Sequence, residues 1–65
     1  MSMNDQEYSE YQAENALQEY NSDEFSGFSE YKKEKIRKAL RAEITFLKNN
    51  YPDSYFLTME LPEGF

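Results

Sequence analysis

The sequence contains no cysteine and no histidine. Disulfide bonds and the common zinc ligands are therefore excluded, and so are the thiol nucleophile and the imidazole base on which many enzymes depend. Glycine occurs only twice, at isolated positions, so there is no glycine-rich loop to hold a phosphate. We therefore expect neither an enzyme nor a protein that carries a metal or another cofactor.

Long apolar runs are also missing. No stretch approaches the roughly 20 apolar residues that a membrane-spanning helix needs, and the first residues are polar and acidic, unlike a signal or transit peptide. We therefore expect a soluble cytoplasmic protein that does not enter a membrane. Its 65 residues predict one small domain, 1–65, whose thin core requires close helix packing or a partner chain for stability.

Charge is distributed in three blocks along the chain. Residues 1–31 contain eight acidic side chains and no lysine or arginine, residues 32–41 carry a net charge of +5, and residues 42–65 carry −3. An antiparallel hairpin would lay the acidic first block beside the basic second block. We expect this complementarity to favour the register of such a hairpin.

The strongest helical signal covers residues 29–50. Ser29 is suited to the N-cap position, and Pro52 prevents the helix from continuing. An α-helix turns by about 100° per residue, which brings spaced apolar residues onto one side. Here this stripe consists of Ile36, Leu40, Ile44, Leu47 and Tyr51.

A second helix is predicted for residues 5–20, because glutamine, glutamate and alanine favour helix formation and the polar segment 21–23 follows as a stop. Its apolar face is small, and Tyr8 and Tyr11 point away from that face. Such a helix depends on tertiary packing for its stability.

The tail, residues 52–65, has a different pattern. Tyr55, Leu57, Met59 and Leu61 recur at every second position, which is typical of a short β-strand. No second strand is predicted in this chain, so the tail either lies across the helices or adds to a sheet edge of another chain. The predicted fold class is therefore mainly α, a two-helix antiparallel hairpin with an extended C-terminal tail that includes at most one short strand.

Tyrosine and acidic residues dominate the first helix, and tyrosine suits interfaces because it combines a broad ring with a polar hydroxyl. We predict a small acidic non-enzymatic protein-binding module, an inhibitor or modulator of a larger enzyme or complex. The chain is similar in composition, though in no motif, to small phage-type viral inhibitors. The predicted partner-binding residues are Glu7, Tyr8, Glu10, Tyr11 and Glu14 in the first helix and Tyr55, Phe56 and Leu57 in the tail.

Two alternatives stay open. Glu7, Glu10 and Glu14 follow one helix face at about 5 Å per turn, near the roughly 6–7 Å spacing of phosphates along a DNA strand. This stripe predicts a DNA mimic that occupies the nucleic-acid-binding site of another protein. In the second alternative, the apolar stripe of the helix 29–50 pairs two chains in a homodimer. Direct nucleic-acid binding is not expected, because 13 acidic residues surround seven basic ones.

Overall fold

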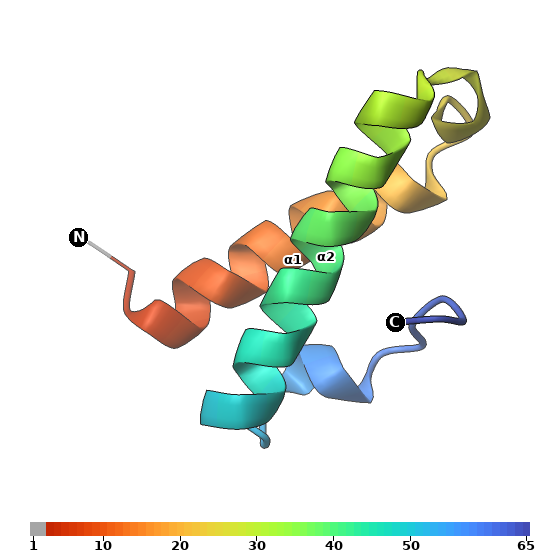
Figure 1. Cartoon of the computed structure of the whole chain (residues 1–65). Coiled ribbons are helices and arrows are strands. Elements are labelled where there is room, and N and C mark those ends of the chain that lie inside the picture. The colour runs from red at the N-terminus through yellow and green to blue at the C-terminus, as the bar shows by residue number, and fades with distance from the viewer. Residues whose placement is uncertain (1–2) are drawn as a thin grey trace.

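Two α-helices make up most of the computed structural model, which describes residues 3–65 (Figure 1). α1 covers Asp5–Asn21 and α2 covers Glu30–Asn50. Two short 3₁₀ helices follow them, η1 at Phe25–Gly27 and η2 at Tyr55–Thr58. α2 turns back across α1 and packs against it, and residues 3–65 contain no β-strand. The prediction of a mainly α helical hairpin is therefore confirmed.

Each α-helix begins at a polar side chain that caps its first turn. The Asn4 side chain accepts a hydrogen bond from the amide of Glu7 at 2.8 Å, and Ser29 Oγ accepts one from the amide of Lys32 at 3.2 Å. These bonds satisfy amides that have no partner inside the helix. The observed bounds of both helices agree with the predicted ones to within one residue.

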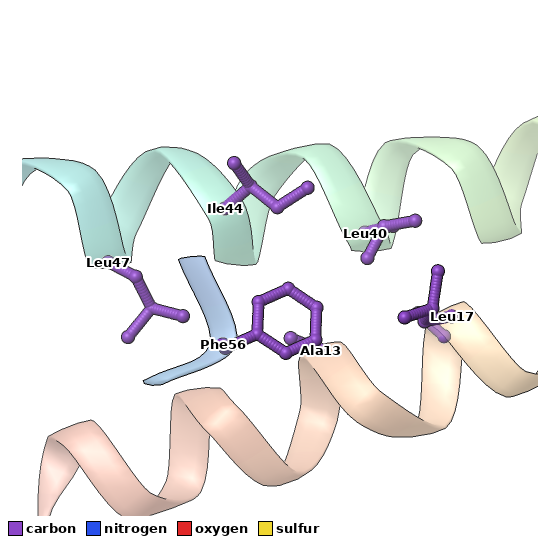
Figure 2. Packing of buried hydrophobic residues seen from close by; sticks show 7 residues of the cluster. Ala13, Leu17, Leu40, Ile44, Leu47 and Phe56 are labelled. Atoms are coloured by element: carbon purple, nitrogen blue, oxygen red, sulfur yellow. The ribbon is translucent and has the colours of Figure 1, made fainter. Parts of the chain in front are cut away.

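The core lies between the two helices and includes one aromatic residue from the tail. Figure 2 shows the Phe56 ring between α1 and α2, close to Ala13 on one side and to Ile44 and Leu47 on the other. The predicted stripe of α2 is buried here, with its half-buried end at Tyr51. The buried cluster consists of Ala13, Ala16, Leu17, Leu40, Ile44, Leu47 and Phe56.

The predicted β-strand in the tail is wrong, because residues 55–58 form η2 instead. Ser54 caps this turn by accepting a hydrogen bond from the amide of Phe56 at 3.2 Å. The turn places Phe56 in the core, whereas a strand with the predicted alternation would have placed it opposite the other apolar residues. Leu61 and Phe65 also pack against the core cluster, so the tail lies across the helices of its own chain.

The acidic and basic blocks do not pair across the hairpin. In the described part of the chain, both ion pairs lie within α2 and join Lys33 to Glu30 and Arg37 to Glu34. Two further cations of α2 lie over aromatic rings. Lys32 Nζ is 4.1 Å from the centroid of Phe28, and the Arg41 guanidinium is 5.7 Å from that of Phe65. No ion pair therefore joins the two helices in the described residues, and the contribution of charge complementarity to the register stays a prediction.

Candidate functional site

The outer face of α1 carries two exposed tyrosines. Tyr8 is 56% exposed and Tyr11 is 49% exposed, while Ser9 and Ala13 are buried on the opposite side of the same helix. This division follows from the 3.6-residue repeat of the helix. Glu7 is also exposed, and it lies one turn from Tyr11. Three of the predicted site residues are thus neighbours on the solvent-facing side of α1.

Glu10 does not belong to this exposed face. Its side chain is buried, with the residue only 7% exposed, and Oε2 accepts hydrogen bonds from Ser54 Oγ at 2.5 Å and Gln6 Nε2 at 3.2 Å. A buried carboxylate needs such partners to offset the cost of its desolvation. The prediction that Glu10 contacts a partner is therefore not supported, and Glu10 instead holds the tail against α1.

Tyr55, the first residue of η2, lies beside Glu14 of α1 and remains 51% exposed. A hydrogen bond with the Glu14 carboxylate, partial desolvation and the negative charges of Glu14 and Glu10 raise the pKa of the Tyr55 phenol above its ordinary value of 10.0. The physical cause is that an ionised Tyr55 would lose its donor proton and face two carboxylates. The structure thus joins one predicted tail residue to the predicted residues of α1.

The other two predicted tail residues both contact the core cluster, but to different extents. Phe56 has no exposed surface, and Leu57 is half-buried against the core cluster. Phe56 therefore cannot contribute to the exposed patch that the sequence predicts, and Leu57 can contribute only the part of its side chain that the core leaves exposed. Their position follows from the 3₁₀ turn, which directs consecutive side chains around its axis rather than to alternate sides.

Five of the eight predicted residues therefore form the outer part of α1 and the adjoining start of η2, and we name this region the acidic tyrosine surface. The rings offer apolar area with polar edges, and the carboxylates accept hydrogen bonds from cationic groups. The first 31 residues contain no lysine or arginine to neutralise these carboxylates. The acidic tyrosine surface consists of Glu7, Tyr8, Tyr11, Glu14 and Tyr55.

A second surface feature was not predicted from the sequence. A groove of about 420 Å³ runs between the two α-helices, and all of its lining residues belong to α1 and α2. Its sequence signal is the pair Ala39 and Ala42, which occupies exposed positions of α2 where long side chains are otherwise frequent. We name this feature the helix groove. Its lining includes the apolar residues Ala16, Ile36, Ala39 and Ala42, together with the charged residues Glu19, Lys32, Lys35 and Glu43.

The fold and these two features define a small two-helix protein with an exposed acidic and aromatic face. Comparisons with protein-family models, with curated proteins and with solved structures find no match to this chain. Within residues 3–65, no helix is both long enough and apolar enough to cross a membrane. The same part of the chain contains no group of three or more acidic side chains placed to hold a metal ion.

Proposed function

We propose that this protein is a non-enzymatic binding module of the cytoplasm that inhibits or modulates a larger protein or complex. The acidic tyrosine surface makes the contact. Catalysis is not part of the proposal, because four of the five side chains of this surface are exposed and Glu14 is only half-buried, whereas catalytic acids and bases are tuned in enclosed pockets.

The observation that carries the proposal is that α1 and the tail segment packed against it both carry half-exposed tyrosines. Tyr8 and Tyr11 come from α1, and Tyr55 comes from the tail more than 40 positions later. Tyr55 lies beside Glu14, and η2 packs against α1. Large aromatic side chains that are fixed before binding lose little conformational freedom in a complex, so they contribute well to affinity.

The DNA-mimic alternative receives less support from the geometry. The predicted stripe needed three carboxylates at successive turns, and its middle member, Glu10, is buried against Ser54. Glu7 and Glu14 remain, two turns or roughly 10 Å apart along the helix. Raising the salt to about 1 M shortens the Debye length to about 3 Å. Partner binding that collapses under this change favours the mimic, and binding that persists favours contacts made by the tyrosine rings.

The homodimer alternative rested on the apolar stripe of α2. Four side chains of this stripe are covered within the chain itself, so they offer no free surface to a second copy while the hairpin is folded. The buried residues of α2 are Ile36, Leu40, Ile44 and Leu47.

Affinity capture from the native cells, followed by quantitative mass spectrometry, tests the proposal. The wild-type chain is the first bait, and the variant Tyr8→Ala with Tyr11→Ala is the second. We expect at least one larger protein to be captured by the wild type and reduced about tenfold or more with the double variant, since each buried tyrosine contributes 1 kcal/mol or more. Tyr31→Ala is the matched control, because Tyr31 is 78% exposed but lies on α2.

Circular dichroism of each bait establishes that it is folded before the comparison is made. Equal capture by the wild type and the folded double variant would contradict the proposed surface. If Tyr31→Ala reduces the amount of captured protein as much as the double variant does, the contact lies on α2.

A further inference from the structure

Four cationic side chains form a row on the exposed side of α2. They recur at every third position, which places neighbouring Cβ atoms about 5–6 Å apart on the helix surface. Like charges at this spacing weaken an isolated helix, so the row is unfavourable for α2 by itself. We name it the cationic row, and it consists of Lys32, Lys35, Lys38 and Arg41, all of them exposed.

The acidic residues in this part of α2 do not neutralise the row. Glu30 and Glu34 form ion pairs with two cations outside it, with Lys33 at 3.5 Å and with Arg37 at 3.2 Å. No member of the cationic row belongs to an ion pair within residues 3–65. Its four charges are therefore available to a partner.

Two further acidic residues flank the row on the side of the helix groove. Glu19 and Glu43 line the groove together with two lysines of the row, whereas Lys38 and Arg41 lie outside its lining. Residues 32–41 contain six cations, and the acids of the groove and of the ion pairs number four. The surface around the row therefore keeps a positive charge, and Lys38 lies in the part that the groove acids do not flank.

Aromatic rings fix the two ends of the row. Lys32 Nζ lies 4.1 Å from the centroid of the Phe28 ring, and the Arg41 guanidinium lies 5.7 Å from that of Phe65. A ring attracts a cation through its quadrupole but does not remove the charge. The end members thus lose less conformational freedom on binding than unrestrained side chains would.

A hollow of about 260 Å³ lies beside the middle of the row. Tyr31, Glu34, Lys35 and Lys38 line it, and the charge of Glu34 is already paired with Arg37. Tyr31 is 78% exposed, more than any other large apolar side chain of residues 3–65. The hollow therefore offers an aromatic ring next to two unpaired ammonium groups.

We propose that the cationic row is a second binding surface of this protein and that its partner is an acidic segment of another protein. The carboxylates of the segment complement the four cations, and one of its apolar side chains packs on the Tyr31 ring in the hollow. The row extends over roughly 14 Å of helix, a length that a short segment covers. It shares no residue with the acidic tyrosine surface, so the two proposals can fail separately.

A nucleic acid fits this surface less well than a short acidic segment does. Its phosphates continue beyond the row, where they meet the carboxylates of a chain whose net charge is −6. Charges are screened over about 8 Å at physiological salt. A short segment held on the row therefore interacts mainly with the cations.

Fluorescence anisotropy with a labelled acidic peptide tests the proposal on the whole chain. The probe is a peptide of about 12 residues, glutamates with one central phenylalanine, which is long enough to cover the row. Lys38→Glu is the test variant, and Lys48→Glu is the matched control. Both reverse one exposed cation of α2 and change the net charge equally, but Lys48 lies outside the row. Circular dichroism establishes that each variant is folded.

We expect the wild type to bind the peptide and Lys38→Glu to weaken the affinity about tenfold or more, because attraction at close range becomes repulsion. Lys48→Glu should change the affinity by less than about twofold, since Lys48 is roughly 15 Å from Lys38 along the helix, beyond the screening length. A thymidine oligonucleotide of the same length should bind more weakly than the peptide.

Three results would overturn the inference: a wild type that does not bind the peptide, equal losses for Lys38→Glu and Lys48→Glu, or tighter binding of the oligonucleotide. Weaker peptide binding by Tyr8→Ala with Tyr11→Ala would also count against it, because those rings lie on α1. If Lys38→Glu abolishes peptide binding but still captures the protein that depends on Tyr8 and Tyr11, both proposals stand. If the wild type ignores the peptide yet captures that protein, only the cationic row fails.

Discussion

α1 and α2 contribute to the same core in different ways. α2 packs against α1 through a continuous aliphatic stripe, and the buried residues of α2 are Ile36, Leu40, Ile44 and Leu47. α1 instead buries small and polar side chains, with one leucine among them: Ser9, Glu10, Ala13, Ala16 and Leu17. The hairpin is therefore asymmetric in its chemistry although both elements are long helices.

This difference explains the role of the tail. The small inner face of α1 leaves space beside Ala13, and Phe56 occupies that space (Figure 2). The polar residues Ser9 and Glu10 find partners in Glu43 and Ser54. α1 is thus held by α2 and the tail together, and its outer face is left for other contacts.

The largest expected effect comes from removing the ring of Phe56. Phe56→Ala should lower the free energy of unfolding by about 3–5 kcal/mol, because the side chain is fully buried and leaves a cavity. A domain of this size has a total stability of roughly 3–10 kcal/mol, so α1 should lose much of its helicity. Urea denaturation followed by circular dichroism measures the change. Tyr55→Ala in the same turn is the control, and equal losses for the two variants would contradict the assigned packing.

A smaller effect is expected at the contact between the tail and the polar part of α1. Ser54→Ala removes the donor to Glu10 and the cap on the amide of Phe56, which should cost about 1–3 kcal/mol because a buried carboxylate loses a partner. A double-mutant cycle with Glu10→Ala isolates the contact, and a coupling energy near zero would argue against it. Thr58→Ala is the control, since that hydroxyl bonds to a backbone carbonyl at the surface.

Loss of the N-cap should destabilise the protein by different amounts for α1 and for α2. Ser29→Ala should destabilise the protein by about 1 kcal/mol, the usual cost of a lost N-cap. Asn4→Ala should cost only about 0.5 kcal/mol, at the low end of the same range, because the exposed first turn of α1 can open without the rest of the fold. Hydrogen exchange of the first-turn amides measures both changes. Faster exchange throughout α1 in Asn4→Ala would contradict this local opening.

The smallest effect concerns Tyr55 at high pH. Its pKa is raised in the folded protein, so folding favours the protonated phenol. This contribution to stability is fully present below the ordinary value of 10.0 and is lost as the pH rises through the folded pKa. Glu14→Gln should move the pKa of Tyr55 back toward that value, as measured by nuclear magnetic resonance of the ring. An unchanged pKa would show that Glu14 is not its cause.

The helices could be predicted because their signals are local. Ser29, Pro52 and the apolar stripe of α2 are legible within a short window of sequence, and the exposure of Tyr8 and Tyr11 follows from helical spacing alone. The tail could not be predicted in this way. The alternation of its apolar residues resembles that of a strand. Phe56 instead occupies a space between α1 and α2, and this space exists only after the two helices have packed.

In the candidate site, too, the properties that depend on local spacing could be predicted, and those that depend on distant contacts could not. Glu10 has the same spacing in the sequence as its exposed neighbours, and only Ser54, 44 positions away, accounts for its burial. The helix groove likewise depends on how two helices lie together, although Ala39 and Ala42 gave a local hint of it. Contacts between distant segments therefore decided which predicted residues remain available to a partner.

The position of Phe56 also has a consequence for how the chain is made. Synthesis proceeds from the N-terminus at about 5–20 residues per second, so both helices leave the ribosome before the residue that fills the space between them. Until residues 54–56 emerge, α1 has neither the ring beside Ala13 nor the partner of Glu10. For that interval the nascent hairpin exposes apolar surface that the finished molecule covers.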